Sequence, residues 1–90
     1  MTVQGEVKAG FEPARAQFEE NLARGDDLGA SFCATVEGEV VVDLWGGFAD
    51  PAKTRPWERD TLVNVYSTTK TMTALTALLL ADRGELDFAA

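Results

Sequence analysis

Histidine is absent from the 90-residue sequence, and cysteine occurs once, as Cys33. A single cysteine cannot form an internal disulfide, and zinc sites need more histidine and cysteine ligands than this chain carries. Catalytic sets of the Ser-His-Asp or Cys-His type are excluded within these residues because they require histidine. We therefore expect no metal and no other cofactor, and a lone cysteine is typical of a reducing compartment.

Basic residues are also scarce. The sequence has eight lysines and arginines but fifteen aspartates and glutamates, which gives a formal net charge of −7 and a pI near 4.3. Nucleic acids and anionic membranes both select clustered positive charge, so we expect neither as a partner. The longest uncharged run, residues 71–81, is too short to span a bilayer, and residues 1–10 lack the apolar core of a signal peptide. The sequence therefore predicts a cytoplasmic protein.

The composition is that of a globular chain, with 46% hydrophobic and 26% charged residues. Ninety residues make one small domain or a piece of a larger one. Residues 1–10 show no periodicity, and we expect an irregular lead there. A helix is predicted over residues 12–24, with proline in its first turn and Gly25 after its end. The spacing of its apolar residues places them on one face: Phe11, Ala14, Phe18 and Leu22.

A β-hairpin is predicted next, with strands over residues 31–37 and 40–45 around a tight turn at Glu37 and Gly38. Two strands alone are marginally stable, so the hairpin needs further strands or a covering helix. Residues 46–60 are polar and contain two prolines, which is typical of a surface loop. Trp57 in this loop has two interpretations: it holds the loop against the body of the protein, which we favour, or it lines a substrate pocket.

Residues 61–65 form a short strand-like approach to a second helix, predicted over residues 67–83. This helix is apolar nearly all round, a pattern that belongs inside a larger protein. Gly84 suits the position just after its end.

A serine and a lysine lie three residues apart at the start of this helix, as Ser67 and Lys70. Helical residues at this spacing have Cβ atoms about 5–6 Å apart, so the lysine amine can reach the serine oxygen. The positive end of the helix and apolar surroundings both favour the neutral amine, and the Ser67 amide can face an oxyanion. The pattern predicts a serine nucleophile activated by lysine. The alternative is that Ser67 is an ordinary N-cap and Lys70 a surface lysine.

Residues 60–70, read Asp-Thr-Leu-Val-Asn-Val-Tyr-Ser-Thr-Thr-Lys, resemble the nucleophile region of the class C β-lactamase-like serine hydrolases. The upstream run Trp-Gly-Gly-Phe-Ala-Asp at 45–50 is similar more narrowly to family VIII carboxylesterases. The resemblance covers about residues 11–88. It implies an α+β, penicillin-binding-protein-like fold, with Ser67 as nucleophile and Lys70 as its base, and hydrolysis of short-chain esters through an acyl-enzyme.

The resemblance also implies that residues 1–90 are the N-terminal part of a longer domain. The family's second motif, with its catalytic tyrosine, and its third motif have no counterpart here. Tyr66 adjoins the serine and cannot replace that tyrosine, so we expect a packing role for it. The partners expected are a small ester substrate and the remainder of the same protein, and we expect the isolated chain to be inactive. Two alternatives remain: a β-lactamase or D-alanyl peptidase, and a non-catalytic fragment that docks its apolar helix on a partner.

Overall fold

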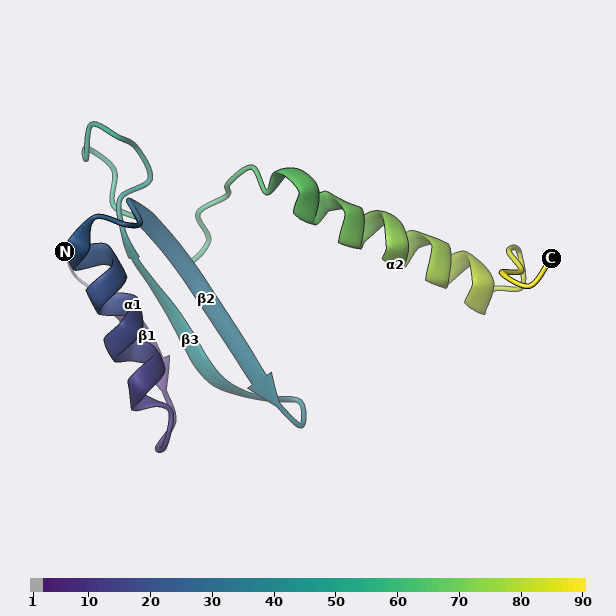
Figure 1. Ribbon diagram of the computed structural model, residues 1–90, viewed down its shortest axis with the longest axis horizontal. Helices are drawn as coiled ribbons and strands as arrows, with labels where there is room; N and C mark the ends of the chain where they lie inside the picture. Colours follow the sequence, from purple (N-terminus) through teal and green to yellow (C-terminus); the bar gives the residue numbers. More distant parts are fainter. Residues whose placement is uncertain (1–2) are drawn as a thin grey trace.

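The computed structural model describes residues 3–90 as an α+β arrangement of a three-stranded sheet and two α-helices (Figure 1). The elements in chain order are β1 (Val3–Val7), α1 (Glu12–Arg24), β2 (Gly29–Val36), β3 (Glu39–Gly47), the 3-10 helix η1 (Tyr66–Thr68) and α2 (Thr69–Asp82). The α+β class predicted from the sequence is therefore correct.

The sheet has the order β1-β3-β2, and both pairs are antiparallel. The irregular lead predicted over residues 1–10 is wrong for its described part, because Val3–Val7 is a strand paired with β3. The alternation of Val3 and Val7 was hidden because Gly5 occupies the inward position between them. Glycine is required there, since a Cβ at Gly5 would lie 2.0 Å from the Asp43 carbonyl oxygen.

Helix α1 has the bounds predicted from the sequence. Its end is set by Gly25, which adopts a left-handed φ of 81°. The Gly25 N–H donates to the Leu22 carbonyl at 3.2 Å and the Asp26 N–H to the Asn21 carbonyl at 3.1 Å, a pairing that satisfies the last carbonyls of a helix.

The hairpin turn falls at Glu37 and Gly38 as predicted, but both strands are longer than expected, and β3 includes Gly46 and Gly47. The register shifts between Ala34 and Thr35, so that Val41 is an extra residue of β3. Such a bulge increases local twist and lets the hairpin curve.

The core lies between α1 and one face of the sheet. Leu22 of α1 is 1% exposed and Leu44 of β3 is fully buried. The buried strand residues contact half-buried apolar side chains from β1, from α1 and the residue before it, and from β2, namely Val3, Val7, Phe11, Ala14, Phe18 and Ala34. The sheet and α1 therefore supply the covering contacts that a lone hairpin lacks.

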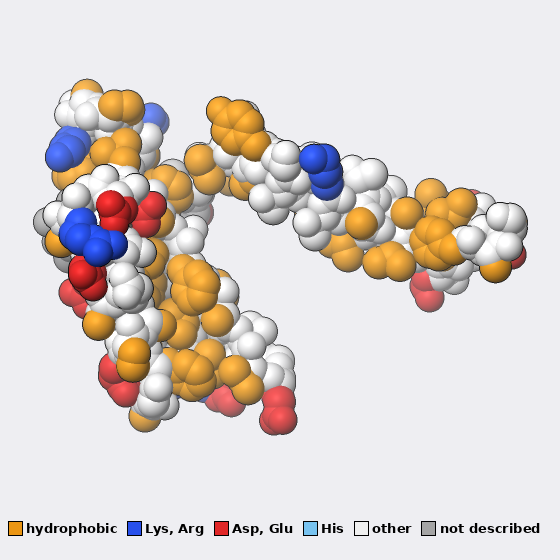
Figure 2. Space-filling view, in the orientation of Figure 1, with side chains coloured by type: hydrophobic (Ala, Val, Ile, Leu, Met, Phe, Trp, Pro, Cys, Tyr) orange, Lys and Arg blue, Asp and Glu red, His pale blue; other side chains and the backbone are white. Residues whose placement is uncertain are grey.

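Helix α2 extends away from the sheet (Figure 1), and the space-filling view shows apolar side chains along it (Figure 2). None of its residues is buried, and its large apolar side chains are 37–60% exposed: Met72, Leu75, Leu78, Leu79 and Leu80. No described element packs along it, so within residues 3–90 the helix is exposed, as expected of an apolar pattern that belongs inside a larger protein. The radius of gyration, 17.3 Å, exceeds the roughly 12 Å of a compact 90-residue domain for the same reason.

Residues 61–65 form no strand, contrary to the strand-like approach predicted, because no neighbouring strand offers them hydrogen bonds within the described residues. The second helix begins with the 3-10 turn at 66–68 and becomes α-helical at Thr69. It ends at Asp82, where the N–H groups of Gly84 and Glu85 donate to the carbonyls of Ala81 and Leu80. Across residues 3–90, no helix combines the length and hydropathy that crossing a membrane requires.

Candidate active site

Ser67 and Lys70 lie together at the first turn of the second helix. The Lys70 Nζ donates to the Ser67 Oγ over 3.4 Å, which is long for a hydrogen bond. Ser67 belongs to the 3-10 turn and Lys70 to the first turn of α2, so the spacing of three residues places both on the same side of the helix start. The sequence pattern and the structure agree on this pairing.

The Ser67 hydroxyl does not cap the helix. Neither the 3-10 turn nor α2 has a side-chain hydrogen bond at its N-cap, and the N-cap positions are Val65 and Thr68. The alternative in which Ser67 is an ordinary N-cap is therefore wrong in this structure. The hydroxyl is left to pair with Lys70.

The apolar enclosure expected around Lys70 is not formed by residues 3–90, where Ser67 and Lys70 are both exposed. The reason is the position of α2, which contacts the adjoining 3-10 turn but packs against neither the sheet nor α1. The two side chains form their hydrogen bond while open to solvent. Further residues would be needed to cover them and exclude water.

Within residues 3–90, Tyr66 does not take the packing role expected of it. Its side chain is 79% exposed, and its backbone is in the left-handed region with a φ of 49°. Its N–H donates to the Asn64 Oδ1 at 2.9 Å. Asn64 carries no predicted role, although asparagine two residues before such a turn is a known signal of this local bond.

Trp57 holds its loop against the end of the sheet, which is the interpretation favoured from the sequence. Its backbone N–H donates to the Gly47 carbonyl at 2.9 Å. Its ring lies so close to Gly29 that a Cβ there would be 2.7 Å from a ring carbon. The indole N–H is buried and finds no acceptor among residues 3–90.

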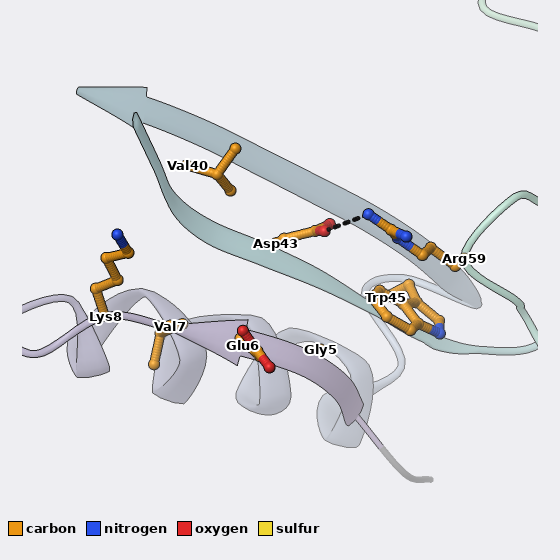
Figure 3. A pocket seen from close by; sticks show the side chains of 8 residues that line it. All are labelled: Gly5, Glu6, Val7, Lys8, Val40, Asp43, Trp45 and Arg59. Carbon is orange, nitrogen blue, oxygen red and sulfur yellow. Dashed lines mark hydrogen bonds and ion pairs between the residues drawn. The ribbon is translucent and has the colours of Figure 1, made fainter. Parts of the chain in front are cut away.

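A second contact fastens the same loop to the sheet (Figure 3). The Arg59 Nη2 lies 3.2 Å from the Asp43 Oδ2 of β3, and its guanidinium stands 5.9 Å from the centroid of the Trp45 ring. The indole N–H of Trp45 donates in turn to the Gln4 side chain of β1 at 2.9 Å. Asp43, Trp45 and Arg59 border a groove of about 540 Å³, and neither Ser67 nor Lys70 lines it. The groove holds no pairing of a nucleophile with a base.

Asp50 organises the first part of the loop. Its carboxylate accepts hydrogen bonds from the Thr54 hydroxyl and from the backbone N–H groups of Thr54 and Arg55, each 3.0 Å from Oδ1. The side-chain hydrogen bond from Thr54 and then the Arg55 N–H lower the pKa of Asp50 below its ordinary value of 3.8. In the part of the chain that is described, no group of three or more candidate ligands could hold a metal ion.

Known proteins with similar sequences place the chain in a family. The family model described as Beta-lactamase matches residues 14–90. The chain belongs to the beta-lactamase family. A 62-residue stretch is 44% identical to "Esterase/beta-lactamase LipL" of Mycobacterium tuberculosis (strain ATCC 25618 / H37Rv), which amounts to 69% of this chain and 14% of that protein.

Two solved structures of this beta-lactamase-like fold match closely. A family VIII carboxylesterase superposes on the whole chain with a TM-score of 0.95 and 49% identity. A penicillin-binding protein homologue from Caulobacter crescentus matches 98% of the chain with a TM-score of 0.91 and 44% identity. The chain spans 24% of the length of each of these structures, so it holds about a quarter of what they contain. The resemblance seen in the sequence, both to the family and to its carboxylesterases, is confirmed.

Proposed function

We propose that these residues form part of a serine hydrolase that cleaves short-chain carboxylic esters, with Ser67 as nucleophile and Lys70 as base. The observation that carries the proposal is the contact between the Lys70 Nζ and the Ser67 Oγ, 3.4 Å apart at the start of an apolar helix. Supporting it, the Ser67 hydroxyl is not used as a helix cap.

The proposed chemistry is acyl transfer in two steps. The Ser67 Oγ attacks the ester carbonyl carbon while its proton passes to the Lys70 amine. The carbon–oxygen bond to the alcohol breaks, the alcohol leaves with the proton that Lys70 took up, and the acyl group stays on Ser67. Water then gives a proton to Lys70 and attacks the acyl carbon; the bond to Ser67 breaks, the carboxylic acid leaves, and the proton returns from Lys70 to the Ser67 oxygen. In this proposal the Ser67 N–H, near the helix N-terminus, donates to the oxyanion that forms in both steps.

The preference for esters rests on the names of the relatives. One is called a carboxylesterase and another an esterase/beta-lactamase. The choice of acyl group and the choice of alcohol in the ester would depend on residues outside this quarter of the fold. We propose short acyl chains because that is the substrate class implied by the family VIII resemblance.

Covalent labelling of the complete protein with a fluorophosphonate tests the nucleophile. Ser31 and Ser67 are the only serines in the sequence, so Ser31→Ala is a matched control for Ser67→Ala. We expect label on the native protein and on Ser31→Ala, and a loss on Ser67→Ala. Label that persists at residues 3–90 of Ser67→Ala would contradict the assignment.

The base is tested with Lys70→Ala, and Lys53→Ala is its matched control because Lys53 is an exposed lysine of the loop. General base catalysis contributes about 10²–10⁴-fold, so turnover of p-nitrophenyl butyrate should fall by that order in Lys70→Ala. Equal turnover in the two variants would remove Lys70 from the mechanism.

A second candidate is a β-lactamase or D-alanyl peptidase type of hydrolase. It is favoured by the 44% identity to a penicillin-binding protein homologue and by the double name of the mycobacterial relative. Both candidates use the same acyl-enzyme, so they differ only in substrate. Nitrocefin turnover that exceeds ester turnover in kcat/KM would favour this second candidate.

We further propose that the apolar surface of α2 packs against other residues of the same polypeptide. The support is the exposure of its leucines together with the length of the solved relatives, about four times that of this chain. A non-catalytic role, in which α2 docks on a separate partner, is the remaining alternative. It would be favoured if the complete protein failed to react with the fluorophosphonate.

The cytoplasmic location is likewise a proposal, and cell fractionation tests it.

A further inference from the structure

The backbone of Tyr66 is unusual for its residue type and its place. Three non-glycine residues within residues 3–90 have positive φ: Glu37 at 51°, Lys53 at 59° and Tyr66 at 49°. Glu37 lies in the hairpin turn, and Lys53 closes a tight turn by donating its N–H to the Asp50 carbonyl at 3.0 Å. Tyr66 instead opens a helix and directly precedes Ser67. This conformation is sterically strained for a bulky residue, so it persists only where the surrounding structure imposes it.

The surroundings that impose it are local. The Tyr66 side chain is 79% exposed, so packing of its ring within residues 3–90 does not hold the backbone. The Asn64 Oδ1 accepts the Tyr66 N–H at 2.9 Å, and the Thr68 N–H donates to the Val65 carbonyl at 3.0 Å. Among the described residues, Asn64 supplies the one side-chain hydrogen bond to the backbone of residues 65–68.

The conformation of Tyr66 supports the first turn, which carries Ser67. A change in φ at Tyr66 moves the Val65 carbonyl relative to the residues that follow, so the Thr68 N–H loses its acceptor at 3.0 Å and the turn that carries Ser67 must re-form. The Ser67–Lys70 contact is already long at 3.4 Å, so a displacement of a few tenths of an ångström breaks it. Displacements of about 1 Å in a reacting geometry can cost about 10²-fold in rate.

We propose that Asn64 is a positioning residue, which holds Tyr66 in the left-handed conformation and thereby aligns Ser67 with Lys70; this rests on the proposed hydrolase function. Asn64 does not touch the reacting atoms. Its effect passes through the Tyr66 amide alone. Glycine at position 66 would remove the need for Asn64, because glycine adopts positive φ without steric penalty.

The test uses steady-state kinetics on p-nitrophenyl butyrate with the complete protein. Asn64→Ala should lower kcat at least tenfold and change KM less than threefold, whereas Asn64→Asp, which keeps an acceptor oxygen, should retain most of kcat. The double variant Asn64→Ala with Tyr66→Gly should recover most of the lost kcat. A kcat in Asn64→Ala that equals the native value, or a double variant without recovery, would overturn the inference.

A second pair of variants does not depend on how Asn64→Ala folds. Tyr66→Gly should keep kcat near the native value, and Tyr66→Val should lower it about tenfold, because a β-branched residue tolerates positive φ least. Equal kcat in the two would overturn the inference. Ser67→Ala is included as a separate arm: a loss of turnover in Ser67→Ala beside a normal Asn64→Ala would sink the positioning role and leave the proposed function standing. Turnover that survives Ser67→Ala would refute the proposed function and this inference with it.

Discussion

At the scale of single residues, the close approach of β3 to the start of β2 depends on Gly47. Gly47 has a φ of 86°, and a Cβ there would lie 2.4 Å from the Leu28 carbonyl oxygen and 2.8 Å from the Gly29 Cα. Both atoms belong to the backbone, so neither can move without disturbing the sheet. Glycine at position 47, where β3 ends, is thus a steric requirement.

Gly47→Ala should therefore be strongly destabilising. We expect a loss of about 3 kcal/mol or more in the free energy of unfolding, from left-handed strain together with overpacking. Gly38→Ala is the matched control, because Gly38 has a similar φ of 79° but open space around its Cβ position. The control should lose only about 1 kcal/mol. Urea unfolding of the complete protein measures both, and equal losses would contradict the steric account.

At the scale of elements, the loop between β3 and the second helix is the least regular part of the structure and yet is held at several points. Trp57 ties it to Gly47, Arg59 ties it to Asp43, and Phe48 pairs with Pro56 as an isolated bridge. The Arg59 side chain of the ion pair with Asp43 is exposed, and pairs open to solvent in this way contribute about 0–1 kcal/mol. The loop is therefore ordered mainly by hydrogen bonds and by the contact of the half-buried Trp57 ring with Gly29.

The loop should loosen in acid because of Asp50. The pKa of Asp50 is lowered in the folded state, first by the Thr54 side-chain hydrogen bond and then by the Arg55 N–H. Because the pKa is lower in the folded state, the ionised carboxylate stabilises the folded loop fully at pH values above 3.8, the ordinary pKa of the group. This stabilisation is lost as the pH falls from 3.8 through the lowered pKa of the folded state.

Amide hydrogen exchange at Arg55 measures this effect. Protection should fall as the pH drops below about 3.8, beyond the intrinsic pH dependence of exchange. Asp50→Asn keeps an oxygen acceptor but cannot ionise, so its protection at Arg55 should show no such additional dependence. The same acid response in Asp50→Asn would rule out Asp50 as the source.

At the scale of the whole molecule, the chain has a packed part and an unpacked part. The sheet and α1 share a core centred on Leu44, whereas α2 contacts only the adjoining 3-10 turn among the described elements. Apolar exposure of this extent marks an interaction surface or an aggregation liability. The 90-residue chain alone should therefore associate with itself and bind hydrophobic dyes, and should not turn over esters.

The variant Leu75→Glu tests whether α2 is packed inside the complete protein, because it should have different effects in the 90-residue chain and in the complete protein. Leu75 is half-exposed in residues 3–90. In the 90-residue chain the charge should reduce self-association, measured by size-exclusion chromatography. In the complete protein the same change should lower the free energy of unfolding by several kcal/mol, because a buried unpaired charge is costly. Unchanged stability of the complete protein would mean that α2 is not packed there.

How much could be predicted from the sequence depends on the range of the interactions involved. The bounds of α1 were predictable, because apolar spacing, an early proline and a terminal glycine all act within one helix. The hairpin turn and the Ser67–Lys70 pairing were also predictable, since both are set by neighbours within a few residues. The strand β1 was missed because Gly5 interrupts its alternation, and only the pairing with β3 reveals it.

The sequence by itself determined that a serine and a lysine stand at helical spacing at the start of an apolar helix, with no histidine among residues 1–90. Only the tertiary structure decided that β1 pairs with β3, that the Trp57 ring lies against Gly29, and that α2 finds no cover among residues 3–90. The physical reason is that residue type and spacing specify local hydrogen bonds, such as the one from the Tyr66 N–H to Asn64, whereas strand pairing and burial depend on which segments meet in space.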